Sequence, residues 1–590
     1  MAERRTRTTK EKAGGGGNRG SRTGGTSGGN SGGGSGSDGS GTPSASLRPE
    51  RELIVVAEPS ARLRAAPYAV ASLAGADTSQ LSAVLTAEEI TLEPVFGPDE
   101  ETIRARGAAA PAAGTAGLAE FYRVRAGDDR LDALAERLAA AEHVSAAYVK
   151  PAAEPASVEA PPRLEVLQPP AATPDFTPLQ GYLGPAPGGV DAQWAATQAG
   201  GRGATIRIID VEGEWLFTHE DLLLNAGGVL TGNPPGDLGW RNHGTAVIGE
   251  IGADDNGIGV LGIAPDAVVR GASIFGNPGS ATCIQQAADA LGPGDIILLE
   301  LHRPGPRFDF APRGDQRGYI AIEWWPDDLA AVRYAVGKGI IVVGAAGNGA
   351  ENLDDALYDT PAAGFPATWQ NPFNPANPSS GAVIVGAGAP PSGTFGPDRS
   401  RLDFSNYGAR VDAQGWGREV VTTGYGDLQD GADENRWYTE RFSGTSSASP
   451  IVVGSLAAIQ GMQAAAGRAK LTPAQAQNLL RTTGSPQQDG LNGPATQRIG
   501  NRPDLRQAMA ALVPVVTESG IASQYWDELT PYPAGSARSL WFFVNSAWRH
   551  LDDPNAVIQD MVQRAFLGSG STVQVWHQGD VVVGLVVSGT

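Results

Sequence analysis

Runs of apolar residues alternate with amphipathic stretches through the middle of the chain. The runs DIILLEL, GIIVVGAA and GAVIVGAGA are nearly continuous and bounded by Gly or Asp, and ATIRIID and DAVVRGASI are similar. Such runs are typical of parallel strands that are buried on both faces. The stretches CIQQAADAL, DDLAAVRYAVGKG and SASPIVVGSLAAIQGMQAAAG predict helices. The alternation predicts a doubly wound, mostly parallel α/β domain over residues 190–513.

A small α+β domain is predicted before it, over residues 51–150. LAEFYRVRA is interpreted as a strand whose side chains alternate between two faces, and VSAAYVKP as another strand. Between them, apolar residues recur at the spacing of a helix with one buried face. These helical positions are Leu131, Leu134, Ala135 and Leu138.

A second small α+β domain is predicted over residues 514–590. SLWFFV and STVQVWHQGDVVVGLVVSG predict strands, and DPNAVIQDMVQRAFL predicts a helix. We expect Trp541, Trp548 and Trp576 to lie in its core, because large aromatic side chains are more often buried than ligand-binding. A docking site for a regulatory partner is a further hypothesis for this domain, although no motif supports it.

Two segments are predicted to lie outside the domains. Residues 1–50 form a Gly/Ser-rich leader that we expect to be disordered, and the Pro/Ala-rich residues 151–189 predict an extended, exposed linker. No apolar run reaches 18 residues, so no membrane-spanning helix is expected. The leader lacks the apolar centre of a secretory signal, which favours a cytoplasmic location but leaves signal-independent export open.

Composition narrows the function classes. The chain has 44 Lys and Arg residues against 64 Asp and Glu residues, a formal net charge of −20. This acidity argues against nucleic acid or an anionic membrane as the partner, since both require a basic surface. The single cysteine, Cys283, excludes an internal disulfide and a cysteine-based metal centre.

Three polar residues stand where an α/β sheet collects catalytic groups. Asp210 ends the predicted strand ATIRIID, His243 lies in NHGTAVIGEI, and Ser446 opens a predicted helix. A serine hydroxyl becomes a nucleophile when a histidine takes its proton and a carboxylate orients that histidine. Taken singly, each residue also has an ordinary structural interpretation as a turn, surface or helix-capping residue.

Four motifs together carry a family resemblance. HGTAVIGEI, AAGNG, GTSSASPIVVG and RPDLRQAM occur in this order. Over residues 190–513 the chain resembles the subtilisin-like serine proteases, or subtilases, whose triad follows the order Asp, His, Ser. The resemblance implies a serine endopeptidase in which Asp210 orients the base, His243 is the general base, Ser446 is the nucleophile and Asn348 stabilises the oxyanion.

The resemblance also implies a structural Ca²⁺. DDNGIGVLGIAP resembles the calcium-binding loop of the family, and HEDL resembles the segment that contributes an aspartate. Ligands that are all oxygen atoms suit this ion, although the alternative is a turn that is held without metal. The implied ligands are the side chains of Asp221 and Asn256 and the backbone carbonyls of Asp254, Ile258 and Val260.

The chain departs from the family pattern next to the expected acid. Asp210 is followed by Val211 and Glu212, where the family has a small hydroxyl residue and Gly. This change, together with Glu300, motivates the alternative of a pseudoprotease that keeps the fold to bind peptides.

The predicted substrate-binding strand also departs from the family. It reads Glu300-Leu301-His302, where the family has Ser-Leu-Gly. Glu300 either attracts a basic substrate residue or pairs locally with His302 or Arg303, and we favour the local pairing. The resemblance further implies substrate-binding roles for Gly347 and for Gly364, the latter as the floor of the S1 pocket.

The domain at residues 51–150 resembles a subtilase propeptide, with an unrelated adaptor domain as the alternative. The resemblance implies an autoinhibited zymogen whose own N-terminal domain lays its extended tail in the cleft. It also implies autoprocessing within the linker, between Pro151 and about Gly189. The partners expected are therefore a protein or peptide substrate and this N-terminal domain.

Overall fold

The computed structural model describes most of the chain beyond the predicted leader, which lies outside the described residues except for Glu50. We distinguish an N-terminal domain (residues 50–157), a central domain (172–513) and a C-terminal domain (514–588). None of the helices in these parts combines the length and the apolar character needed to cross a bilayer. The described residues are 50–109, 117–157, 172–276, 279–528, 530, 538–552, 554–567 and 572–588.

Seven parallel strands form the middle of the central domain. They are β8 (Arg207–Glu212), β9 (Ala226–Thr231), β10 (Val268–Ser273), β11 (Ile296–Leu299), β14 (Ile341–Ala345), β15 (Val383–Gly388) and β16 (Val411–Trp416). Their spatial order is β16-β15-β14-β11-β8-β10-β9, so the first strand lies inside the sheet and later strands extend it on both sides. This topology confirms the predicted doubly wound α/β fold.

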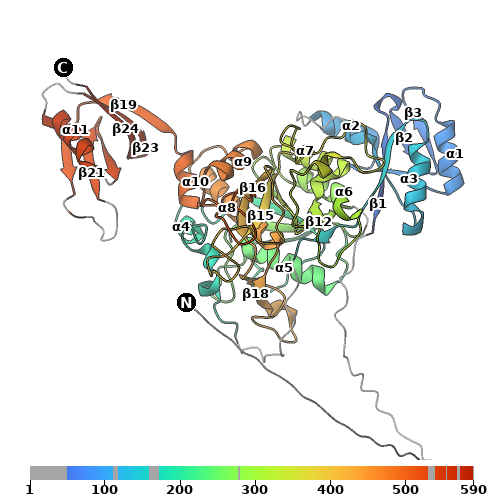
Figure 1. Cartoon of the computed structure of the whole chain (residues 1–590), viewed down its shortest axis with the longest axis horizontal. Coiled ribbons are helices and arrows are strands. Elements are labelled where there is room, and N and C mark those ends of the chain that lie inside the picture. Colours follow the sequence, from blue (N-terminus) through green and yellow to red (C-terminus); the bar gives the residue numbers. More distant parts are fainter. Residues whose placement is uncertain are drawn as a thin grey trace, which may run out of the picture. The chain divides into compact units, whose positions relative to one another are not determined.

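Helices cover both faces of this sheet (Figure 1). Alternate side chains of β11 enter the two resulting cores: Ile296 and Leu298 pack on the side of α5 and α8, and Ile297 and Leu299 on the side of α6 and α7. This two-residue alternation explains why the strands are apolar throughout. The helices of the domain are α4 (Ala192–Ala196), α5 (Leu238–Gly252), α6 (Gly279–Ala290), α7 (Pro326–Gly337), α8 (Thr445–Ala465), α9 (Pro473–Thr482) and α10 (Leu505–Leu512).

Two smaller β-structures complete the central domain. One is the hairpin of β17 (Val420–Thr423) and β18 (Tyr438–Phe442). The other is a three-stranded antiparallel sheet in the order β13 (Tyr319–Ala321), β12 (Leu301–Pro304) and β7 (Glu154–Pro155). Its third strand comes from the end of the N-terminal domain.

The N-terminal domain is a four-stranded antiparallel sheet with helices. The sheet order is β4-β5-β1-β6. On β1, Leu53 and Val55 pack into the core of this domain, whereas Ile54 and Val56 join the core that contains residues of α6 and α7. One face of the sheet therefore packs on the central domain. The elements are β1 (Glu52–Ala57), β2 (Leu63–Ala66), β3 (Ala69–Ser72), α1 (Ser79–Glu88), β4 (Leu92–Pro94), α2 (Glu100–Ala109), β5 (Phe121–Val124), α3 (Leu131–Ala139) and β6 (Val144–Lys150).

The expectation of an exposed linker over residues 151–189 is wrong in part, because exposed residues such as Pro174, Pro178 and Pro187 are interspersed with buried ones. Ala153 and Ala156 are buried before the undescribed residues 158–171, and Tyr182 and Leu183 are buried after them. Proline and alanine content predicted an extended chain, but it does not reveal whether an extended chain is covered by a neighbouring domain.

The C-terminal domain has a six-stranded sheet in the order β19-β23-β24-β22-β21-β20. Its core contains Leu540, Phe542 and Val544 of β21. The expectation that Trp541, Trp548 and Trp576 fill the core is wrong, because all three lie outside it and Trp548 is 38% exposed. The alternation along SLWFFV places Trp541 on the opposite face from this core. The elements are β19 (Val515–Gly520), β20 (Gln524–Asp527), β21 (Ser539–Val544), β22 (Ala547–Asp552), α11 (Ala556–Leu567), β23 (Thr572–Gln578) and β24 (Val581–Ser588).

Candidate active site

The end of β8 and the second turn of α5 bring a carboxylate to His243. The Asp237 side chain caps α5 by accepting the Trp240 N–H at 3.0 Å. His243 Nδ1 lies 2.7 Å from Glu212 Oε2, and both side chains are buried. Burial lowers the pKa of His243 to about 4, although the charge of Asp210 acts in the opposite direction. The imidazole is therefore neutral at pH 7, with one nitrogen directed at Glu212.

The expected partner of His243 was Asp210, and here the structure departs from the sequence interpretation. Asp210 and Glu212 are two residues apart on β8, so both side chains project to the face that α5 covers. The longer glutamate makes the contact with the imidazole, and Asp210 Oδ2 instead accepts the indole N–H of Trp215 at 2.8 Å. Asp210 lies within hydrogen-bonding reach of Glu212.

Ser446 lies at the start of α8. Its hydroxyl and Nε2 of His243 are both buried, and neither makes a well-formed hydrogen bond within the described structure. Asn348 reaches the same helix start, because its Oδ1 accepts the Thr445 N–H at 2.9 Å. Asn348 Nδ2 donates to Oε1 of Gln316 at 3.1 Å. The serine and the asparagine thus meet at one helix start. His243 belongs to the same buried site, because it lies near enough to lower the pKa of His302, whose Nδ1 accepts the Asn348 N–H.

Glu300 is a further buried carboxyl of this site. Its Oε1 lies 2.5 Å from the Ser449 hydroxyl, one turn beyond Ser446 on α8. The expected local pairing with His302 or Arg303 is wrong, because Nδ1 of His302 accepts the Asn348 N–H at 3.3 Å and Arg303 bonds elsewhere. Burial raises the pKa of Glu300 well above its usual range, and the nearby Asp210 adds to this effect.

A segment of the N-terminal domain occupies the site. β7 pairs with β12 in antiparallel register, with Pro155 opposite Leu301 and Glu154 opposite His302. The carbonyl of Ala156 accepts the backbone N–H of Ser446 at 3.2 Å. Residues 153–157 therefore lie across the serine in the extended conformation that a bound peptide would adopt.

The comparisons with known proteins agree with this geometry. Residues 230–501 match the model of the subtilase family. The central domain is therefore subtilase-like. Alkaline elastase YaB from Bacillus sp. (strain YaB) is 29% identical over 263 residues, which are 44% of this chain and 55% of that protein. A thermophilic serine proteinase from Bacillus sp. (strain AK1) is 31% identical over 304 residues, 49% of this chain and 60% of that protein.

The chain spans about half the length of alkaline elastase YaB, a curated relative that it matches. Among solved structures, fervidolysin from Fervidobacterium pennivorans, described as a keratinolytic enzyme related to subtilisin, is 16% identical with a TM-score of 0.45. That match covers 85% of this chain and 71% of fervidolysin.

Two glycines of the subtilase domain do not line the segment in the cleft as expected. A Cβ on Gly364 would lie 1.9 Å from the carbonyl oxygen of Ala147, so Gly364 permits close contact with β6 of the N-terminal domain rather than forming the floor of an S1 pocket. A Cβ on Gly347, which has φ +97°, would instead meet the amide of Asn406 at 2.8 Å. Leu301 does lie beside the occupied cleft, opposite Pro155.

Two of the expected calcium ligands of the subtilase domain, the side chains of Asp221 and Asn256, already accept protein N–H groups. Asp221 accepts the side-chain amide of Asn256 at 2.9 Å and the N–H of Val260 at 2.6 Å. Asn256 Oδ1 accepts the N–H of Ile258 at 3.0 Å, and Asp254 accepts the N–H of Leu223 at 2.7 Å. Within the described residues no group of three His, Cys, Asp or Glu side chains could hold a metal. The hydrogen bonds of the Asp221 and Asn256 side chains suit the alternative of a turn that is held without metal.

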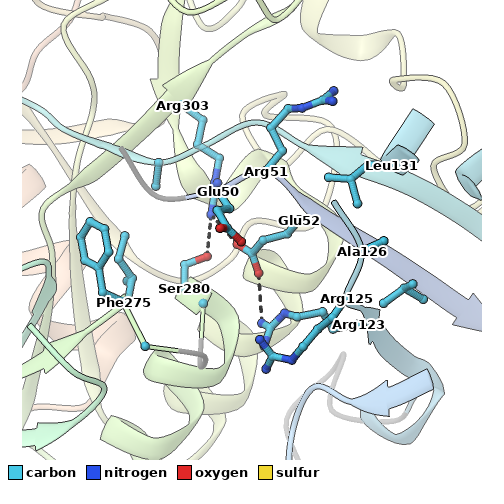
Figure 2. Close-up of a pocket in the computed structure, with 15 residues that line it drawn as sticks. Glu50, Arg51, Glu52, Arg123, Arg125, Ala126, Leu131, Phe275, Ser280 and Arg303 are labelled. Carbon is cyan, nitrogen blue, oxygen red and sulfur yellow. Dashed lines mark hydrogen bonds and ion pairs between the residues drawn. The ribbon is translucent and has the colours of Figure 1, made fainter. Parts of the chain in front are cut away.

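A buried charge network joins the N-terminal domain to the subtilase domain. Lys150 of β6 is fully buried and contacts Asp327 and Asp328 at the start of α7. In the adjoining pocket, Glu52 lies between Arg303 and Arg123, and Arg303 donates to the Ser280 hydroxyl at 2.7 Å (Figure 2). The Glu52–Arg123 ion pair measures 3.0 Å. Burial opposes ionisation of Glu52, but the surrounding cations hold its pKa at about 2.

Several residues of this site escaped the sequence analysis. In the sequence, Glu212 is visible only as a departure from the family pattern. Its two-residue spacing from Asp210 could have shown that both side chains lie on the same face of the strand. Gln316 and Tyr319, which contact the segment in the cleft, follow β12 and carry no motif. Lys150 ends a predicted strand, where a lysine ordinarily indicates an exposed position.

Proposed function

We propose that this chain is a serine endopeptidase that uses Ser446, His243 and Glu212, and that it is made as a zymogen inhibited by its N-terminal domain. The observation that carries the proposal is the 2.7 Å contact of Glu212 with Nδ1 of His243. Neither Nε2 of His243 nor the Ser446 hydroxyl makes a well-formed hydrogen bond within the described structure. An imidazole oriented through one nitrogen keeps the other available as a base.

The chemistry follows from these positions. His243 Nε2 takes the proton of Ser446 as its oxygen attacks the substrate carbonyl, and Glu212 stabilises the imidazolium that forms. The backbone N–H of Ser446 and the side chain of Asn348 stabilise the oxyanion. His243 then protonates the departing amine, and water hydrolyses the acyl-enzyme.

Asp210 acts behind Glu212 in this proposal. Asp210 Oδ1 and Glu212 Oε1 are both buried and without a partner among the described residues, whereas the other oxygen of each carboxyl is bonded. A single proton shared between the two free oxygens would satisfy both. Burial raises the pKa of Asp210 well above its usual range, and the neighbouring Glu212 raises it further. Burial also raises the pKa of Glu212, but its hydrogen bond with Asp210 opposes that rise, so we assign the proton to Asp210 and the charge to Glu212.

The zymogen part of the proposal rests on the occupied cleft. The carbonyl of Ala156 takes the N–H of Ser446, which an oxyanion would otherwise use. Ile54 and Val56 of the same domain pack into the core that contains residues of α6 and α7. The domain that carries the segment therefore makes contacts of its own with the subtilase domain. An incoming substrate would have to displace the segment from the cleft against the contacts of the N-terminal domain.

A fluorophosphonate probe, which reacts with an activated serine, tests the proposal on the full chain. We expect wild-type protein to be labelled after several hours at neutral pH and Ser446→Ala protein to remain unlabelled. Ser455→Ala is the matched control, because Ser455 lies on the same helix and bonds only the Ile451 carbonyl at 2.8 Å. Absence of labelling in folded wild-type protein would favour the pseudoprotease alternative.

A further inference from the structure

We infer that the peptide bond between Ala156 and Ser157 is the bond that this protein cuts in itself. The inference rests on the proposed function and narrows it to one bond. The first observation is the place of the bond relative to the nucleophile. Ala156 offers its carbonyl oxygen to the N–H of Ser446, whose own hydroxyl is the attacking group. A carbonyl held there is the one whose oxygen becomes the stabilised oxyanion.

The chain is fixed on both sides of this bond. Before it, Glu154 and Pro155 pair with β12 in antiparallel register. After it, Ser157 forms an antiparallel bridge with Gly444. A Cβ on Gly444 would lie 2.3 Å from the Ala156 carbonyl oxygen, so glycine permits this close approach. Because the segment is held on both sides of the bond, a slip of one residue would break contacts on both strands.

Side chains of the subtilase domain add selectivity for this stretch. Tyr319 donates its hydroxyl to Glu154 Oε1 at 2.9 Å, and Gln316 Nε2 donates to the Pro155 carbonyl at 3.2 Å. Gln316 also accepts from Asn348, so one side chain links the bound segment to the oxyanion-stabilising amide. Burial raises the pKa of Tyr425, and a hydrogen bond with the Ser157 side chain offsets part of that rise. The Tyr319 contact favours an acidic residue two positions before Ala156, whereas the bond of Gln316 to the Pro155 carbonyl holds the backbone of the segment.

Ala156 itself is completely enclosed, with 0% of its surface exposed. An enclosed methyl group leaves no room for a long or charged side chain unless the surroundings move. The residue before the cut must therefore be small, and this constraint applies to substrates in trans as well as to the chain itself.

The proposed step balances as an ordinary acyl transfer. Ser446 Oγ forms a bond to the carbonyl carbon of Ala156, and its proton moves to His243 Nε2. The bond from this carbon to the Ser157 nitrogen breaks, and the nitrogen leaves as an amine with the proton from His243. Water then cleaves the ester, which restores Ser446 and leaves a carboxylate on Ala156 and a new N-terminus at Ser157.

Intact-mass analysis and N-terminal sequencing of the purified full chain test the inference. We expect wild-type protein to yield a fragment that begins at Ser157 and Ser446→Ala protein to stay whole. A cut at another position that Ser446→Ala abolishes would overturn the inference and leave the proposed function standing. Failure to cut would also overturn it, and fluorophosphonate labelling of the same sample would then show whether the proposed function fails as well.

A pair of arginine substitutions sharpens the test. Ala156→Arg should slow the cut at least ~100-fold, because an enclosed, unpaired charge is costly to bury. Ala152→Arg is the matched control, since Ala152 lies four residues earlier in the same segment but is only half-buried, and we expect its rate within about threefold of wild type. Equal rates for the two variants would contradict the assignment of Ala156.

Discussion

Two clusters of buried carboxyl groups in this protein have opposite electrostatic environments. In the network between the domains, Lys150, Arg123 and Arg303 surround the acids. Around the nucleophile, no salt bridge to Lys or Arg is found among the described residues. We call the first the interface cluster and the second the active-site cluster. The interface cluster comprises Glu52, Asp327 and Asp328, and the active-site cluster comprises Asp210, Glu212 and Glu300.

A serine hydroxyl in each cluster shows what the difference means. Ser280 accepts from Arg303 and lies 2.5 Å from Asp328, so its proton is available to an ionised carboxylate. Ser449 lies 2.5 Å from Glu300 and 2.7 Å from the carbonyl of Thr445, which can only accept. If the Ser449 proton goes to that carbonyl, Glu300 must carry a proton to complete its own hydrogen bond. Cations surround the buried acids at the interface, whereas burial raises the pKa of the carboxyls beside the nucleophile, which form no ion pair with Lys or Arg among the described residues.

The largest effect that tests this comparison is expected at Glu212. Glu212→Gln keeps the shape of the side chain but removes the charge that orients and stabilises His243. We expect the rate of the cut at Ala156 to fall about 10⁴-fold, the loss known for a comparable amide substitution in a serine protease triad.

Asp210→Asn is the matched variant for that experiment. An asparagine can still accept from Trp215 and donate to Glu212, as a protonated aspartate does. The loss should therefore stay within about tenfold, and equal losses in the two variants would show that Asp210 is ionised.

A somewhat smaller effect is expected in the interface cluster. Lys150→Met leaves Asp327 and Asp328 buried without their shared cation, which typically costs 3–5 kcal/mol. In a Ser446→Ala background, urea titration should show the free energy of unfolding lowered by about this amount. Lys338→Met is the control, because the Lys338–Asp289 pair is partly exposed and such pairs contribute about 1 kcal/mol or less. If Lys150→Met and Lys338→Met lower the free energy of unfolding by similar amounts, burial does not strengthen the contribution of Lys150.

A third prediction concerns pH. His243 must be neutral to accept a proton, and burial lowers its pKa to about 4 from the ordinary histidine value of about 6.5. The rate of the first cut in a single turnover should therefore change little between pH 8 and pH 5.5 and should fall only near pH 4. A roughly tenfold fall by pH 5.5 would match an unshifted imidazole and would mean that ionised carboxylates stabilise its charged form.

The smallest effect is expected for calcium. Because Asp221 and Asn256 already accept protein N–H groups, adding Ca²⁺ or EDTA should leave the melting temperature of Ser446→Ala protein unchanged. An ion present at 100 times its dissociation constant would instead stabilise the fold by about 2.7 kcal/mol. Such a rise would show that the loop rearranges around a metal.

The sequence predicted the parts of the fold that depend on periodic patterns. DIILLEL and GIIVVGAA became β11 and β14, because strands buried on both faces must be apolar throughout. SLWFFV corresponds to β21, and its alternation was visible. It did not reveal which face carries the core, so Trp541 was misplaced.

The site was predicted less completely than the fold. Motifs identify His243, Ser446 and Asn348, which the structure brings together, but they do not reveal that Glu212 extends past Asp210 to reach the imidazole. The burial of Ala153 and Ala156 depends on a domain that docks through residues far away in sequence, such as Lys150 and Ile54. Contacts of that kind leave no local pattern.

The single chain that connects the N-terminal domain to the cleft has a consequence for how activity would appear in solution. While the bond at Ala156 is intact, the inhibiting segment is held at an effective concentration that short tethers set in the millimolar range. After the cut, the same segment competes as a separate molecule at its actual concentration. Dilution alone would then release activity, so the onset of proteolysis should depend on how concentrated the processed protein is.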